Sequence, residues 1–382
     1  MSATDRPRIL TGDQPTGRLH IGHWVGSLEN RIRLQDDYDC YFLIANTHAF
    51  TTRAAEPEAI RRDTLEIVKD WLAAGIDPER STLVLQTEIP AIAELTWFLS
   101  MLLPVNRVLR NPTLRAELDA KDLGDNYCFG FPLYTVGQCA DILAFRARLV
   151  PVGDDQAAHV EMCREVARRF DHVYCGVDPT TPDADYERAG GVFPVPEAMI
   201  GRVGRLVGLD GVRKMSKSMD NAVYLSDTTA QIRAKVARLH TGRQAMTDPG
   251  DISNPLFQYV RAFLSDPDRI RELEDRYARG DHIGDGAIKA EVATAIDALV
   301  APMRERRAAY DGPRGDAMIV ELLQAHAGRA NRIANQTLAM ARAAMKLDFG
   351  AGGGGSPRPR FLSSSAVRPW SDRRLDRVRY RR

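Results

Sequence analysis

Cysteines and long apolar segments are scarce in this sequence of 382 residues. Its five cysteines are odd in number and never spaced C-x-x-C, so we expect neither a disulfide framework nor a zinc knuckle. No apolar run approaches the roughly 20 residues that a membrane-spanning helix requires, and the opening MSATDRPRIL lacks the apolar core of a signal peptide. We therefore expect a cytoplasmic protein without a membrane partner.

The chain also has little net charge, +1 at pH 7, but that charge is unevenly distributed. Residues 357–382 contain nine arginines and two aspartates, a charge of +7 that leaves −6 for the rest. Because an acidic body does not attract phosphate as a whole, nucleic acid would have to bind at a local basic face. Residues 350–356 are rich in glycine, so we expect 350–382 to be a flexible linker and a disordered arginine-rich tail.

Short apolar runs alternate with segments of helical periodicity in the first part of the chain. The strand-like runs are 6–10, 40–45, 81–86 and 149–152, and the helical segments are 57–74, 91–102, 134–145 and 156–170. This alternation predicts an α/β fold, a doubly wound parallel sheet with helices on both faces, at 1–222. This α/β domain contains a polar, irregular insertion near 104–128. From 227 to 347 only helical periodicity remains, which predicts a C-terminal all-helical domain at 223–349.

The first strand leads into TGDQPTGRLHIGHWVGS, residues 11–27, which has glycines at 12, 17, 22 and 26. This stretch follows the carboxyl end of a parallel strand, the edge where such sheets bind ligands. A helix that begins near His20 would point free N–H groups and a positive dipole end toward that edge, which suits phosphate. The stretch matches neither G-x-G-x-x-G nor the P-loop pattern, so those two nucleotide-binding motifs are excluded.

A second motif, KMSKS, occupies residues 214–218. Lys214 and Lys217 are three residues apart among small hydroxyl side chains, a cationic loop that suits the charge of a polyphosphate. His-Ile-Gly-His at 20–23 precedes this motif by about 190 residues, and the pair in this order resembles the signature of class I aminoacyl-tRNA synthetases.

Within that class, residues 9 to about 348 resemble bacterial tryptophanyl-tRNA synthetases. The resemblance is carried by GDQPTGRLHIGH, ANTHAF, GIDP, CADIL and VPVGDDQAAHVEMCREVARRF. It implies a Rossmann-like catalytic domain and a helical domain that binds the tRNA anticodon. It further implies that L-tryptophan is activated with ATP and Mg²⁺, that tRNA(Trp) accepts the tryptophan, and that the protein is a homodimer.

Two alternatives remain open. Tyr134, Gln138 and Asp141 share one helix face, and this Tyr-x-x-x-Gln-x-x-Asp pattern is closer to tyrosyl-tRNA synthetases. In tryptophanyl enzymes the aspartate matching Asp141 accepts the indole N–H. Leu10 stands where tyrosyl enzymes carry a tyrosine that binds the substrate phenol, which favours tryptophan. The second alternative is a synthetase paralogue with a regulatory binding role and weak tRNA charging.

The resemblance also implies roles for individual residues. The residues implied in catalysis are His20, His23, Lys214 and Lys217. Those implied in ATP binding are Gln14, Pro15, Thr16, Gly22, His23, Gly153, Asp154, Asp155, Leu206, Lys214, Met215, Ser216, Lys217 and Ser218. Those implied in tryptophan binding are Leu10, Gly12, His48, Tyr134, Gln138, Asp141 and Gln156. No protein metal site is expected, because Mg²⁺ would be held mainly by phosphate oxygens. The amino-acid carboxylate is already an anion, so catalysis would consist of alignment and charge neutralisation.

Overall fold

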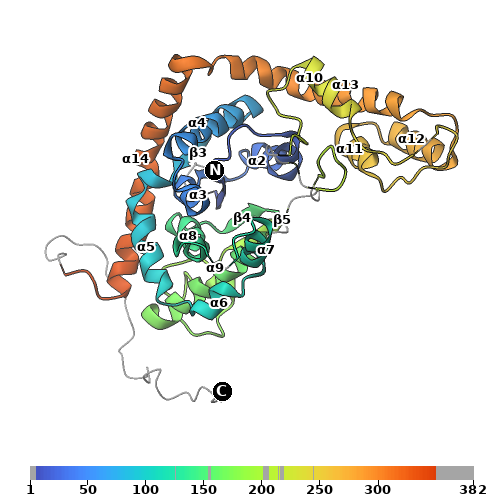
Figure 1. Cartoon of the computed structure of the whole chain (residues 1–382). Coiled ribbons are helices and arrows are strands. Elements are labelled where there is room, and N and C mark those ends of the chain that lie inside the picture. The colour runs from blue at the N-terminus through green and yellow to red at the C-terminus, as the bar shows by residue number, and fades with distance from the viewer. Residues whose placement is uncertain are drawn as a thin grey trace.

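The computed structural model of the chain describes residues 6–124, 126–153, 156–200, 206–213, 215, 219–243 and 245–349. Within these residues one parallel sheet has the strand order β3-β2-β1-β4-β5 (Figure 1). The strands are β1 (Arg8–Asp13), β2 (Asp39–Ile44), β3 (Ser81–Leu85), β4 (Leu149–Val152) and β5 (Glu197–Ile200). This order places β1 beside β4, where the direction of winding reverses.

Side chains of successive strand residues point to opposite faces of the sheet, and each face carries its own apolar core. Ile9 and Phe42 belong to the core that includes α4 (Pro57–Ala74). Their neighbours Leu10 and Tyr41 belong to the opposite core. That core is completed by α5 (Pro90–Ser100), α8 (Gly130–Ala144) and α9 (Ala157–Phe170). The doubly wound parallel sheet expected from the sequence is therefore confirmed.

The described residues after 226 form helices without further strands, which confirms the expected helical C-terminal region. The helices are α10 (Thr229–Ala237), α11 (Pro255–Phe263), α12 (Pro267–Arg279), α13 (Asp285–Ala308) and α14 (Gly312–Ala344). Their starts follow from local chemistry, because the side chains of Thr228, Asn254 and Asp266 accept backbone N–H bonds in the first turn. Figure 1 shows α11 and α12 beyond the sheet, whereas α13 packs on α4.

Helix α14 runs back along the sheet and covers its β3 edge (Figure 1). The backbone N–H of Leu83 in β3 donates to His326 Nδ1 at 2.9 Å, and Asn331 donates to the carbonyl of Glu88 at 2.7 Å. Ala334 and Leu338 of the same helix join the core shared by α5 and α8. An edge strand offers unpaired backbone groups with which another chain can pair. Helix α14 lies against β3 at this edge, where a further strand would otherwise pair.

Three local expectations were incomplete or wrong. The fifth strand, β5, was not expected, because its side chains are largely exposed and it has no apolar alternation. The insertion expected to be irregular contains α6 (Val105–Leu109) and α7 (Pro112–Ala120). The Asn111 side chain accepts N–H bonds from Thr113 and Leu114, and Pro112 occupies the first turn of α7, which are ordinary start signals for a helix. Helix α8 begins four residues earlier than expected, at Gly130.

Short helical turns complete the described elements: η4 (Asp171–Cys175) and η5 (Asp183–Asp185), besides those of the site below. No helix within the described residues is long and apolar enough to cross a membrane.

Candidate active site

The carboxyl ends of β1 and β4 form one edge of the sheet. They are joined by the hydroxyl of Thr11, which donates to the carbonyl of Pro151 at 2.7 Å. Gly12 is exposed at this edge, and a Cβ on it would lie 2.5 Å from the carbonyl oxygen of Leu43 in the neighbouring strand. Only glycine fits there, and its bare backbone leaves the edge open. Ligands of doubly wound sheets bind at this reversal point.

The turn after β1 is anchored on both sides. Gly17 has a φ of +87°, a conformation that glycine adopts readily. Arg53 of α3 (Asn46–Arg53) donates to the carbonyl of Pro15 at 3.1 Å. Arg31 of α2 (Glu29–Leu34) donates twice to Asp13, at 2.7 and 2.9 Å. Burial alone would raise the pKa of Asp13, but the charge of Arg31 holds that pKa below its usual value. Gln14 and the exposed Thr16 lie on this fixed turn.

The two histidines of the first motif lie against each other at the start of a helix. His20 is the N-cap residue of α1 (Ile21–His23), and its backbone N–H donates to His23 Nδ1 at 3.1 Å. The ring centroids are 3.8 Å apart. His20 is buried and His23 is half-buried. The helix continues through the π-helical η1 (Trp24–Leu28), a form found often at functional sites.

The structure brings the second motif against the first. Met215 is buried, and a Cβ on Gly22 would lie 3.2 Å from the Met215 sulfur. The backbone N–H of Ile21 donates to the carbonyl of Val223 at 2.9 Å, and that of Leu225 donates to the carbonyl of Leu19 at 3.0 Å. The segment after KMSKS thus pairs with the segment that enters the helix at His20. Leu206 is buried in the core that also holds Leu19. Lys214, Ser216, Lys217, Ser218, Asp154 and Asp155 lie outside the described residues.

A second polar cluster surrounds Asp141 on α8. The carboxylate is buried, and Gln86 of η2 (Gln86–Glu88) donates to its two oxygens at 2.8 and 3.0 Å. The same amide nitrogen lies 3.0 Å from His48 Nε2. The backbone N–H of Thr47 donates to Gln86 Oε1 at 3.1 Å, which fixes the orientation of the amide. His48 Nε2 is therefore the acceptor of this bond, and its ring proton belongs on Nδ1.

The pKa values of this cluster follow from its burial. Burial raises the pKa of Asp141 to about 7, although the hydrogen bond from Gln86 acts in the opposite direction. Burial, with the charge of His159, lowers the pKa of His48 to about 4. His48 Nε2 is 3.8 Å from the Asp141 carboxylate, and at neutral pH this contact is dipolar rather than an ion pair. The cluster therefore presents a carboxylate that titrates near neutrality.

Tyr134 lies between this cluster and α9, with its ring centroid 5.8 Å from that of His48. Its hydroxyl is 3.3 Å from His159 Nε2 on α9, and burial raises its pKa. Gln156, the N-cap residue of α9, lies one turn before His159, and its backbone N–H donates to the carbonyl of Gly153 at 3.0 Å. Gln138 is half-buried on α8, between Tyr134 and Asp141 in sequence. Leu10 is buried in the same apolar core as Tyr134.

Sequence reasoning missed Gln86 and His159. Gln86 follows directly after β3, and a polar residue at the carboxyl end of a parallel strand is a signal that could have indicated it. His159 lies in the segment VPVGDDQAAHV but had no assigned role. Its contact with Tyr134 depends on the packing of α9 against α8. Within the described residues no group of three or more His, Cys, Asp or Glu side chains is placed to hold a metal ion.

Known proteins resemble this chain over most of its length. A family model described as tRNA synthetases class I (W and Y) matches residues 1–301. The tryptophan--tRNA ligase of Lactococcus lactis subsp. lactis is 38% identical over 351 residues, which cover 90% of this chain and 99% of that protein. The corresponding ligase of Streptococcus pneumoniae serotype 4 is 39% identical over 352 residues, with the same coverage. The structure of tryptophanyl-tRNA synthetase from Campylobacter jejuni, complexed with ADP and tryptophan, has a TM-score of 0.73 and 30% identity, covering 89% of this chain and 100% of that one.

Proposed function

Because the chain belongs to the tryptophanyl-tRNA synthetases, within the class I family of W and Y enzymes, we propose that it activates L-tryptophan with ATP and transfers it to tRNA(Trp). The reaction forms tryptophanyl-adenylate and pyrophosphate, and a terminal ribose hydroxyl of the tRNA then accepts the tryptophan. The curated relatives are tryptophan--tRNA ligases, so the tyrosine alternative is set aside.

The observation that carries the proposal is the pairing of the two signature segments. Leu19 and Ile21 bond to Leu225 and Val223, and Met215 packs at Gly22. In the proposal, Lys214 and Lys217 act on a ligand that lies at the His20–His23 turn. The transition state of adenylate formation places charge on the departing pyrophosphate, so cations beside a helix start stabilise it.

In this scheme ATP lies over the open edge at Gly12. The turn residues Gln14, Pro15 and Thr16 and the β4 terminus at Gly153 line its binding site, and His20 and His23 contact the phosphates. Lys214 and Lys217 neutralise charge on the leaving pyrophosphate. Mg²⁺ is bound through the phosphate oxygens of ATP, which are the hard ligands that it prefers.

Tryptophan occupies the pocket of α8. An indole ring offers a single hydrogen-bond donor, and the buried carboxylate of Asp141 is a matching acceptor. Tyr134, Gln138, His48 and Gln156 surround the amino acid, and Leu10 is part of the apolar wall. Asp141 is held by Gln86 before the ligand arrives, which lowers the ordering cost of binding.

The helical region 223–349 recognises the tRNA anticodon, and the position of α11 and α12 beyond the sheet leaves them away from the ATP site (Figure 1). The protein acts in the cytoplasm, where tRNA is charged for translation.

The protein is also a homodimer. Trp97 of α5, Met101 directly after that helix and Val105 of α6 have 66%, 58% and 70% of their surface exposed, and contact with a second copy would bury these apolar side chains. Sedimentation equilibrium checks this assignment. Trp97→Glu should shift the protein toward monomers, and a wild-type monomer at micromolar concentration would contradict it.

ATP–pyrophosphate exchange with each of the twenty amino acids tests the main proposal, followed by aminoacylation of total tRNA. We expect exchange with tryptophan and charging of tRNA(Trp). Better exchange with tyrosine would refute the substrate assignment. Exchange with tryptophan but no tRNA charging would favour the regulatory paralogue.

A further inference from the structure

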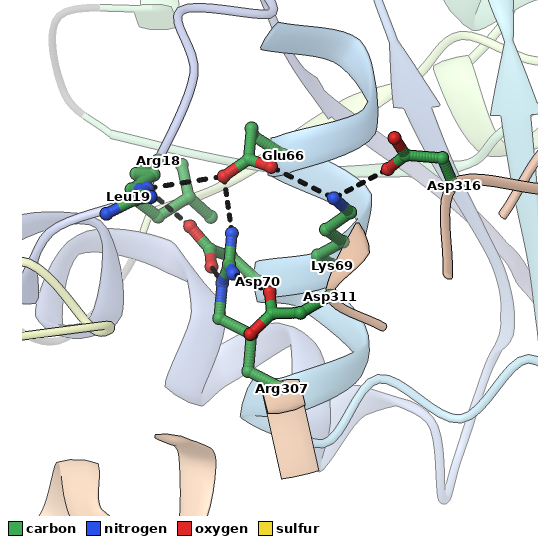
Figure 2. Close-up of polar contacts among 8 residues, drawn as sticks. All are labelled: Arg18, Leu19, Glu66, Lys69, Asp70, Arg307, Asp311 and Asp316. Atoms are coloured by element: carbon green, nitrogen blue, oxygen red, sulfur yellow. Dashed lines mark hydrogen bonds and ion pairs between the residues drawn. The ribbon is translucent and has the colours of Figure 1, made fainter. Parts of the chain in front are cut away.

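The entrance to the His20–His23 turn is held from outside the sheet. Leu19, which precedes His20, is fully buried, and its backbone N–H donates to Asp70 Oδ2 of α4 at 2.6 Å (Figure 2). Its carbonyl accepts the bond from Leu225 described above. Both backbone groups of this one residue are thus bound, one by a buried carboxylate and one by the segment after KMSKS.

Asp70 has a second donor, and it comes from the helical region. Arg307 of α13 donates from Nε to Asp70 Oδ1 at 2.7 Å, and the Asp70 side chain is completely buried. The other guanidinium nitrogens of Arg307 pair with Glu66 and Asp311 (Figure 2). The planar guanidinium is therefore fixed in three directions, and it fixes the carboxylate that binds Leu19.

We propose that Asp70 and Arg307 are positioning residues for adenylate formation, which act through the backbone of Leu19 to hold His20 in register with residues 223–225, the segment after KMSKS. Helix α13 thereby sets the geometry of the ATP site without touching ATP. This inference rests on the proposed function. A shift of about 1 Å in a reacting group can cost a factor of about 10² in rate, so a residue that places the turn has a large effect on catalysis.

The same interface contains a matched control. Asp316 of α14 pairs with Lys69 at 2.7 Å. Asp316→Asn removes this ion pair between α14 and α4, but it leaves Arg307 with its three carboxylate partners and Asp70 with its two donors. It reports the cost of a weakened interface alone.

The experiment measures pyrophosphate exchange and, separately, tryptophan binding by equilibrium dialysis. Arg307→Met and Asp70→Asn should each lower kcat/KM for ATP by about ten- to a hundredfold. The tryptophan dissociation constant should stay within about twofold, because no hydrogen bond or ion pair among the described residues directly joins the Asp141 cluster to Leu19 or Asp70. The Asp316→Asn control should keep kcat/KM within about twofold. The double variant should be no worse than the worse single variant, since both cut one link.

Circular dichroism establishes that each variant is folded. Arg307→Lys, which keeps the charge but not the three-way fork, provides the measurement if Arg307→Met does not fold, and it should show the same loss in smaller degree. A folded Arg307 variant with the kcat/KM of the Asp316→Asn control would overturn the inference. So would a loss of tryptophan affinity as large as the loss in kcat/KM. Wild-type protein that lacks exchange with tryptophan would instead refute the proposed function.

Discussion

Replacing Gln86 by leucine should weaken tryptophan binding by changing the charge of Asp141. The pKa of Asp141 is raised by burial from 3.8 to about 7, which corresponds to about 4 kcal/mol against its ionised form. Gln86 opposes this effect through its two bonds to the carboxylate. A hydrogen bond to a charged group contributes about 1.5–3 kcal/mol, so leucine should reduce the ionised fraction near pH 7 by about ten- to a hundredfold.

The sign of the pH dependence follows. Tryptophan needs the ionised acceptor, so wild-type affinity is full only well above pH 7 and falls as the pH drops through about 7, the pKa of Asp141. In Gln86→Leu the pKa of Asp141 is higher, so the fall begins at a higher pH. The apparent dissociation constant rises in inverse proportion to the competent fraction. His48, with a pKa of about 4, stays neutral over this range. Burial also raises the pKa of the neighbouring Cys163 thiol, which stays protonated.

The assay is equilibrium binding of tryptophan, and of an analogue whose benzothiophene ring lacks the N–H, between pH 5.5 and 9. The analogue should bind wild type and Gln86→Leu alike. Asp141→Asn should give a profile without the titration near pH 7. Gln35→Leu is the matched control, because Gln35 is an equally buried glutamine with three backbone partners remote from Asp141. If the Gln86→Leu profile superimposes on that of wild type, or the analogue loses as much affinity as tryptophan, the reasoning is refuted.

Three further outcomes are expected. Gly137→Ala places a Cβ 2.8 Å from His48 Nε2, so kcat/KM for tryptophan should fall. The free energy of unfolding should decrease by about 1–3 kcal/mol, and unchanged exchange kinetics would contradict this prediction. Lys214→Ala and Lys217→Ala should each cost about 2–4 kcal/mol in the adenylation transition state, as measured by exchange at saturating tryptophan. Tryptophan affinity should stay intact in both variants. His326→Phe leaves the N–H of Leu83 without its acceptor and should cost about 1–3 kcal/mol in urea unfolding. Because burial lowers the pKa of His326, the stability that it confers is complete above pH 6.5 and is lost as the pH falls below that value, a dependence that His326→Phe should abolish.

The central strands were predictable because their chemistry is local. Strands β1 to β4 are apolar runs bounded by turns, and the helical periodicity between them required a parallel sheet. Strand β5 could not be found in this way, since it is an exposed edge strand that exists only through its pairing with β4. The helix α7 was predictable in principle from Asn111 and Pro112, but the polar composition of the insertion obscured that signal.

The same distinction between local sequence signals and tertiary contacts applies to the candidate site. His20, His23, Tyr134 and Asp141 were predicted to be site residues because each belongs to a motif with fixed spacing. The contacts of Gln86 with Asp141 and of Arg307 with Asp70 were not predicted, because each joins residues that lie far apart in the sequence, by 55 and 237 positions. No local pattern encodes such a contact, which is established only when two helices or a helix and a strand pack together.

The covering of β3 by α14 makes the sheet late to mature during synthesis. Leu83 and His326 are separated by 243 residues, a stretch that a ribosome translates in roughly ten to fifty seconds at about 5–20 residues per second. Throughout that interval the β3 edge has been made but its partner has not. The nascent chain therefore carries an open template for intermolecular strand pairing, which water or a chaperone must cover until the last long helix leaves the exit tunnel.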